Sequence, residues 1–146
     1  SHGNMGGVVS VVGSESPRIT ENIAITGNID VTGEVIADKA YIAETTLTDQ
    51  ATITWDMSSQ SVSKVTLAGN RTMAAPTNGS TGQFCSILVI QDGTGSRTLT
   101  WNAVFEFASD TAPTLTTTAS LGDLFTFRYN GSKWLEVGRN QALTLS

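Results

Sequence analysis

The sequence predicts an all-β protein in which a short extension precedes a sandwich or barrel domain. Runs that alternate apolar and polar residues recur about every ten residues, with glycine, asparagine and aspartate turns between them. Threonine, which favours pleated strands, occupies 22 of the 146 positions. This length suits one small domain joined to an extension that does not fold alone.

Three parts are expected, which are residues 1–18, 19–46 and 47–146. Residues 1–18 are interpreted as a cloning remnant followed by a flexible lead-in. Glycine, serine and valine dominate them, and they show no sustained pattern.

Residues 19–46 alternate isoleucine and valine with polar residues, and Gly27 and Gly33 interrupt the row. The pattern predicts very short strands with glycine corners. Because the segment has too few apolar side chains to close its own core, we expect a shaft that associates with copies of itself. One or two helical turns between Glu34 and Glu44 are the alternative, but helix caps are missing and the surroundings are rich in β-forming residues.

The most apolar stretch runs from Phe84 to Ile90 and fills both faces of a strand, which predicts a place at the centre of a sheet. Asp92–Ser96 then supplies turn residues, and Arg97–Trp101 alternates again. We therefore expect the two strands to form a hairpin. Cys85, the only cysteine, is expected to be a buried structural thiol.

The other strands of residues 47–146 are expected between further turn signals. They are predicted at 51–55, 62–67, 71–75 and 104–107, with a last hairpin over 123–137. Trp55 and Trp101 lie in apolar alternation and are expected in the core, and Phe105 and Phe107 are expected to share one face.

The formal net charge of −5 is unevenly distributed. Residues 19–49 hold six acids and one lysine, whereas the six acids and six bases of residues 50–146 cancel. No nucleic-acid partner is predicted, since binding to phosphates needs a clustered basic surface. No apolar run approaches the ~20 residues that cross a bilayer, so no membrane insertion is expected.

Catalytic patterns are weak in this sequence. His2, the only histidine, lies in the predicted remnant, so histidine-based catalysis and histidine metal sites are not expected. A glycosidase would need two opposed acids, whereas the acids of residues 47–146 fall mostly in turns and at strand ends. They are Asp56, Asp92, Glu106, Asp110, Asp123 and Glu136. The sequence therefore predicts no enzyme, no metal and no cofactor.

Asp92–Gly95 is a glycine-containing loop that also invites a ligand-binding interpretation. It lacks the acidic ladder of a calcium loop and the Gly-Lys-Ser/Thr ending of a phosphate loop. A tight turn is the better prediction.

Trp134 is the candidate for ligand binding, because its exposure depends on the register of the last hairpin. A two-residue turn would pair it with Phe127 and bury the indole, whereas a three-residue turn would leave it outside beside Arg128. The second register gives two clean faces and is favoured. An exposed Trp134 flanked by Arg128, Tyr129 and Asn130 would stack on a sugar ring and bind its hydroxyls. A solvated hairpin edge or a subunit contact is the alternative.

Three motifs, taken in order, resemble a module found in bacteriophage tail fibres and related virion proteins. They are Leu47–Asp56 (LTDQATITWD), Leu67–Asn78 (LAGNRTMAAPTN) and Gln91–Asn102 (QDGTGSRTLTWN). The resemblance covers residues 47–139. The Ile/Val and glycine pattern that precedes them is similar to the β-structured shafts of such fibres.

The resemblance implies a homotrimeric fibre, in which a short trimeric β-shaft (19–46) is followed by an antiparallel β-sandwich knob (47–146). It implies an extracellular component of the phage tail, adjacent to other virion proteins, whose knob contacts a bacterial surface glycan or outer-membrane receptor. Two alternatives stay open. One is a monomeric carbohydrate-binding module of a larger extracellular enzyme, and the other is a purely structural virion component.

Overall fold

The structure is a computed structural model that describes residues 18–146. The predicted remnant and lead-in, apart from Arg18, lie outside the described residues. The chain divides into two units, Ser1–Lys39 and Ala40–Ser146, and each is described by itself.

Residues 18–39 of the first unit contain bends but neither helix nor strand. Every side chain in this range is exposed. The large apolar ones are Ile19, Ile23, Ile25, Ile29, Val31, Val35 and Ile36. The short strands predicted for this range are therefore absent from the single chain, as is the alternative helix, and its apolar row faces water.

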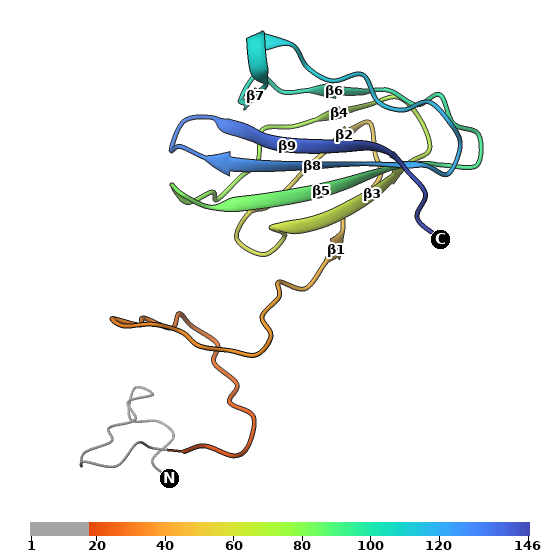
Figure 1. Ribbon diagram of the computed structural model, residues 1–146. Coiled ribbons are helices and arrows are strands. Elements are labelled where there is room, and N and C mark those ends of the chain that lie inside the picture. The colour runs from red at the N-terminus through yellow and green to blue at the C-terminus, as the bar shows by residue number, and fades with distance from the viewer. Residues whose placement is uncertain (1–17) are drawn as a thin grey trace. The chain divides into compact units, whose positions relative to one another are not determined.

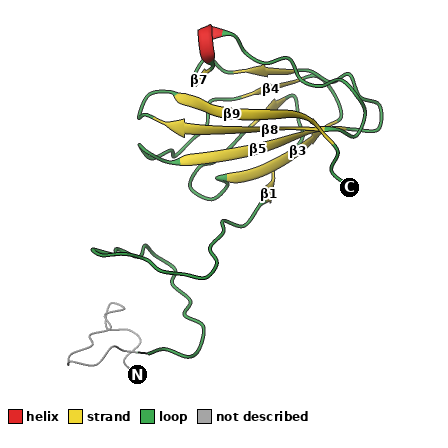
Figure 2. Cartoon of the chain, viewed as in Figure 1, coloured by secondary structure: helices red, strands yellow, loops and turns green. Residues whose placement is uncertain are grey.

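The second unit consists of strands arranged in two sheets, so the all-β prediction is confirmed (Figure 1, Figure 2). The larger sheet has the order β1-β3-β5-β8-β9-β7 and the smaller sheet the order β2-β4-β6. The strands are β1 (Thr45–Thr46), β2 (Thr52–Ile53), β3 (Val62–Leu67), β4 (Arg71–Met73), β5 (Phe84–Gln91), β6 (Leu99–Trp101), β7 (Phe105–Glu106), β8 (Gly122–Tyr129) and β9 (Trp134–Leu143). A single 3-10 turn, η1 (Ala108–Asp110), interrupts them, and no helix within residues 18–146 has the length and apolar character to cross a membrane.

From β1 to β6 the chain passes from one sheet to the other at every step. Successive strands within each sheet consequently run in the same direction: β1, β3 and β5 are parallel, and so are β2, β4 and β6. Only β5, β8 and β9 pair antiparallel. The predicted antiparallel pairing is therefore wrong for most strands of this unit. Between β1 and β6 the chain forms a strand of the other sheet before it re-enters a sheet, and it then runs in the same direction as before.

The hairpin predicted between Phe84 and Trp101 is also wrong. β5 pairs with β3 and β8, as its predicted central position requires, but β6 lies in the other sheet beside β4. Gln91 holds the connection open, since its buried amide bonds both the N–H and the carbonyl of Arg97. Gly95 and Ser96 adopt positive φ angles of 74° and 61° and turn the chain toward the second sheet.

The core lies between the two sheets. Trp101 of the smaller sheet makes edge contact with Phe125 of the larger one, with ring centroids 5.1 Å apart. Trp55 and Cys85 are buried as predicted, and Phe105 and Phe107 are both in the core. Trp101 is only partly buried, and one side of its indole faces the cavity described below.

Candidate functional site

Trp134 does not occupy the exposed position predicted for it. Its side chain is 2% exposed and stacks on the ring of Tyr129. Gly79 packs against the edge of this stack, since a Cβ at this glycine would lie 2.5 Å from Cζ2 of Trp134 and 3.2 Å from Cδ2 of Tyr129. Because no indole face is open to solvent, Trp134 cannot stack on a sugar in this conformation.

The register of the last hairpin explains this burial. Tyr129 pairs with Trp134 and Arg128 with Leu135, so the loop has four residues, unlike either register considered from sequence. Asn130 stabilises the loop, because its side-chain oxygen accepts hydrogen bonds from the backbone N–H groups of Ser132 and Lys133. The four predicted site residues all lie in this hairpin, but they do not share one surface. Trp134 points into the core, whereas Arg128 is exposed.

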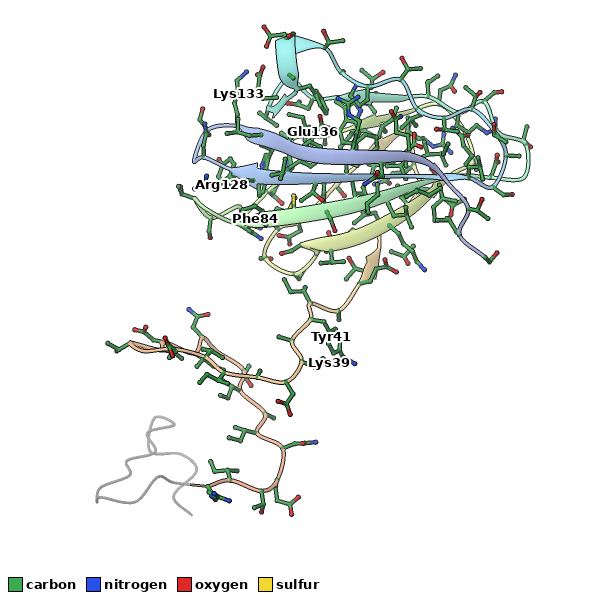
Figure 3. The ribbon with its side chains drawn as sticks, viewed as in Figure 1. Lys39, Tyr41, Phe84, Arg128, Lys133 and Glu136 are labelled. Carbon is green, nitrogen blue, oxygen red and sulfur yellow. The ribbon has the colours of Figure 1, made fainter. Side chains whose placement is uncertain are left out.

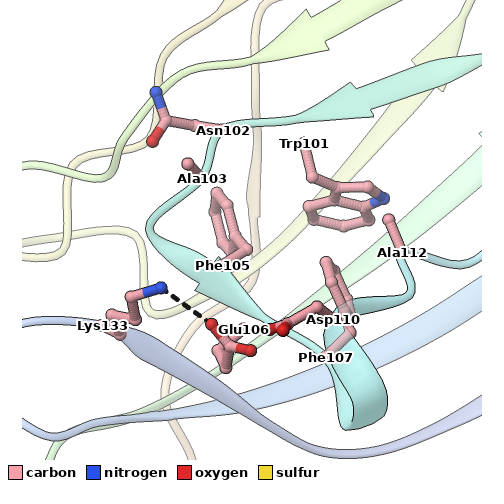
Figure 4. Close-up of a pocket in the computed structure, with 9 residues that line it drawn as sticks. All are labelled: Trp101, Asn102, Ala103, Phe105, Glu106, Phe107, Asp110, Ala112 and Lys133. Atoms are coloured by element: carbon pink, nitrogen blue, oxygen red, sulfur yellow. Dashed lines mark hydrogen bonds and ion pairs between the residues drawn. The ribbon is translucent and has the colours of Figure 1, made fainter.

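A different cavity, of about 300 Å³, lies beside β6 and β7 (Figure 4). Its lining combines aromatic rings with polar side chains, as ligand sites usually do. The lining residues are Trp101, Asn102, Ala103, Phe105, Glu106, Phe107, Asp110, Ala112 and Lys133. β7 is one edge of the larger sheet, and β1, through which the chain enters this unit, is the opposite edge. We call this cavity the β7 cavity.

Local backbone geometry brings the polar groups of the β7 cavity together. Asn102 follows β6, and its side-chain oxygen accepts a hydrogen bond from the N–H of Val104, which shapes the turn into β7. After β7, Ser109 and Asp110 adopt left-handed φ angles of 57° and 53°. This tight return places the Asp110 carboxyl against that of Glu106.

The three charged side chains form one network. The hydrogen bond from Asp110 and the ion pair with Lys133, whose Nζ lies 2.8 Å from Oε2, hold the pKa of Glu106 below its ordinary value. The same contact with Glu106 raises the pKa of Asp110. Of the two carboxyl groups, Asp110 is therefore the one that loses its proton at the higher pH.

The Trp101 indole forms the inner wall of the β7 cavity. Its ring contacts Phe105 and Phe107 edge-on, at centroid distances of 5.1 and 5.6 Å. The indole N–H is buried without a hydrogen-bond partner and points toward Ala112, another lining residue (Figure 4). An unpaired buried donor is costly, and among residues 18–146 this N–H is the polar atom that the fold leaves without a partner near the cavity wall.

This arrangement fits binding better than hydrolysis. Glu106 and Asp110 are hydrogen-bonded to each other, whereas glycosidase acids stand about 5 Å or more apart, on either side of the bond that they cleave. Among residues 18–146 no cluster of histidine, cysteine, aspartate or glutamate is arranged to hold a metal ion. The cavity offers two carboxyl groups, an ammonium group and aromatic edges.

Sequence reasoning named Glu106 and Asp110 only as scattered acids and missed the β7 cavity. A local signal was present, since residues 101–112 supply every lining residue except Lys133. What could not be read locally is the parallel pairing of β7 with β9, which matches Glu106 with Leu135 and so brings Lys133 alongside.

Comparison with known protein families gives a match over most of the second unit. Residues 47–134 match the family described as "Putative phage tail fibre C-terminal domain". The matched range starts at the first core residue, Leu47, and ends at Trp134, so it includes β2 to β8 and the whole lining of the β7 cavity. No curated protein matches the chain. Because the match spans more than half of the sequence, this chain belongs to the phage tail fibre C-terminal domain family.

Proposed function

We propose that this chain is a non-enzymatic, homotrimeric part of a phage tail fibre that contacts the bacterial cell surface. Residues 19–46 hold three copies together, and residues 47–146 form the knob that makes the contact. Membership of the tail fibre family makes the chain a structural component of the virion. We propose in addition that the chain forms a trimer, that it adheres to the cell surface and that it lies outside the cell.

The exposed apolar row carries the proposal. From Ile19 to Ile42 every large aliphatic side chain is exposed, and Ile36 is 90% exposed. Full burial of one such side chain contributes about 1.5–3 kcal/mol, so a row of this length favours association strongly. Identical copies aligned side by side bring the same residues together at the same level, which lets each row cover the others.

The β7 cavity supports the adhesive part of the proposal. It lies at the sheet edge opposite β1, and its polar groups can bond hydroxyls while the aromatic residues pack against a sugar ring. A cavity of about 300 Å³ is at the small end of ligand sites, which suits weak binding to one or two sugar units. Three copies on one fibre would compensate through avidity.

The molar mass in solution tests the assembly. Light scattering should give three times the 15.4 kDa of one chain at micromolar concentration. Replacement of Ile23, Ile25 and Ile29 by serine should shift the mass toward that of the monomer, whereas Thr26→Ser should not. A monomeric wild-type chain would contradict the trimer and favour a monomeric carbohydrate-binding module, for which the β7 cavity would be the binding site.

Glycan binding tests the contact. Purified bacterial surface polysaccharides, arrayed and probed with the labelled chain, should capture the wild-type chain. The Lys133→Ala variant should dissociate from the same polysaccharides at least tenfold faster. Lys64→Ala removes a lysine that is paired with Glu44 outside the cavity and should bind as wild type. Equal binding by both variants would remove the β7 cavity from the proposal, and liberation of reducing sugar ends would contradict a non-enzymatic role.

A further inference from the structure

The two sheets differ in what they present to solvent. In the smaller sheet, Thr52, Thr72 and Thr100 pair in register, and all three are exposed. In the larger sheet, the outward-facing residues of β5 are Phe84, Ser86, Leu88 and Ile90, three of them apolar. A sheet face that remains in water is usually polar. The apolar residues on the outer face of the larger sheet therefore indicate that this face is covered.

Part of this outer face is covered within the chain, and part is open. At one end Leu145 lies over Gly122 beside Leu88, so closely that a Cβ on Gly122 would lie 3.0 Å from both leucines. At the other end Phe84 and Val137 are 56% and 59% exposed. Figure 3 shows Phe84 near Arg128, its direct partner across β5 and β8. The open end is the apolar part that lacks a cover.

Two shallow grooves flank Thr126 of β8 on this open end. One, of about 330 Å³, is lined by Ile42, Val62, Phe84, Cys85, Ser86 and Thr126. The other, of about 280 Å³, is lined by Leu124, Thr126, Val137, Gly138, Arg139 and Asn140. Gly138 leaves open space, since a Cβ there would meet nothing within 4 Å. The face thus carries protruding apolar side chains next to depressions that can receive them, which is the shape that a second copy of itself can fit.

The sheet edges are poorly suited to the alternative of adding a strand. β1 and β7, the two edge strands of the larger sheet, are two residues long each. Such short edges expose little unpaired backbone, so another chain gains few hydrogen bonds there. Association of this unit through the sheet face is favoured over association through its edges.

Continuity with the exposed apolar row identifies the partner. Ile42, the last aliphatic residue of that row, lines the same groove as Val62 and Phe84. The groove thus adjoins, along the chain, the segment that the proposed trimer brings together, and a second copy of the same chain is the occupant that this continuity supports. Of the charges near the face, Lys64 pairs with Glu44 and Arg139 with Glu136 inside the chain, while Arg128 is exposed beside Phe84.

We infer that the outer face of the larger sheet, centred on Phe84, Thr126 and Val137, packs against the neighbouring copy of the same chain. The inference rests on the proposed homotrimer and names the surface that the copies share beyond residues 19–46. The threonine-bearing face of the smaller sheet then stays in solvent, and the β7 cavity stays accessible at the far edge of the larger sheet.

Thiol labelling of the full chain tests the inference directly. In Val137→Cys, the new thiol should react with a maleimide at least tenfold more slowly than the new thiol of Thr72→Cys, once both rates are divided by those of the unfolded chains. Both variants carry Cys85→Ser as well, so that only the new thiol reacts in the folded and the unfolded chains. Since Val137 is exposed in a single chain, protection must come from another copy. Equal labelling in the assembled protein would overturn the inference.

A charge placed in the interface gives an independent measurement. Val137→Asp in the full chain should raise the dissociation constant of the assembly at least tenfold by sedimentation, and Thr72→Asp should leave it unchanged. Circular dichroism of both variants confirms that they are folded. If wild type is a monomer, the proposed function fails first. If wild type is a trimer and both variants dissociate as wild type does, this inference alone is overturned.

Discussion

Tyr129 and Trp134 stack across the β8–β9 hairpin, with ring centroids 4.4 Å apart and ring planes inclined by 19°. Gly79 packs against the edge of this pair, close to both Cζ2 of Trp134 and Cδ2 of Tyr129. The tryptophan that the sequence offered as a sugar-binding platform therefore has a structural role. The polar and aromatic residues around β7 take its place as the candidate contact.

Gly79→Ala should destabilise the fold by about 1–3 kcal/mol, because a methyl group at this position would overlap with the buried Trp134 ring. For a domain of about 100 residues each kcal/mol lowers the Tm by roughly 4–8 °C, which differential scanning calorimetry resolves. Gly93→Ala is the matched control, since its Cβ would meet nothing within 4 Å. An unchanged Tm in Gly79→Ala would show that the loop can move away from the indole.

Gln91→Ala should destabilise the fold by about 1–3 kcal/mol by leaving buried backbone groups unpaired. The Gln91 amide bonds the N–H and carbonyl of Arg97 and the carbonyl of Thr116, which fixes the crossing from β5 to β6. Urea unfolding should show the loss. Gln50→Ala serves as the comparison, because the side chain of Gln50 is exposed; an effect at Gln50 as large as that at Gln91 would contradict the role of Gln91.

Asp123 should make the fold sensitive to acid. Burial raises the pKa of its carboxyl, but hydrogen bonds from Ala142, Thr116 and Gln141 outweigh burial and hold the pKa below the ordinary 3.8. A carboxyl whose pKa is lower in the folded state stabilises the fold above its unfolded pKa, and this contribution is lost as pH falls through the folded pKa.

Asp123→Asn should therefore lower the stability at pH 7 and flatten its decrease between about pH 4 and pH 2, as measured by urea unfolding over that range. Asp30→Asn, which removes a charge from an exposed position in residues 18–39, should leave the acid profile close to that of wild type. A variant as steep as wild type would show that Asp123 does not drive the acid sensitivity.

The carboxyl pair of the β7 cavity gives a prediction for titration. Asp110 should titrate above the ordinary aspartate pKa of 3.8, because Glu106 shares a hydrogen bond with it and adds a negative charge. Glu106→Gln removes that charge and should lower the pKa of Asp110. Lys133→Met should instead raise the pKa of Glu106, since it removes the ammonium partner. Carbon-detected NMR of the side-chain carboxyls measures both, and an Asp110 pKa that Glu106→Gln leaves unchanged would contradict the pairing.

Local patterns in the sequence were sufficient for the class of fold and for much of the core. The continuous apolar run Phe84–Ile90 placed a strand at the centre of a sheet, and β5 lies there between β3 and β8. Trp55 and Cys85 were assigned to the interior and are buried, and Phe105 and Phe107, expected to share one face, are both in the core. These predictions hold because burial of an apolar side chain depends mainly on its own hydrophobicity and on the period of the strand.

Strand partners, direction and register were decided by the tertiary structure. Gln91 and the positive φ angles of Gly95 and Ser96 send β6 to the other sheet, and nothing in the alternation of 97–101 distinguishes that crossing from a hairpin. The four-residue loop at Asn130 likewise depends on the pairing of Tyr129 with Trp134 and on the packing of Gly79 against these two rings. By itself the sequence determined an all-β chain with a tail fibre module and an apolar row that its own chain does not bury. Contacts between residues far apart in sequence determined that Trp134 is buried and that the β7 cavity forms, because pairing energies in a sheet come from neighbours that local periodicity does not identify.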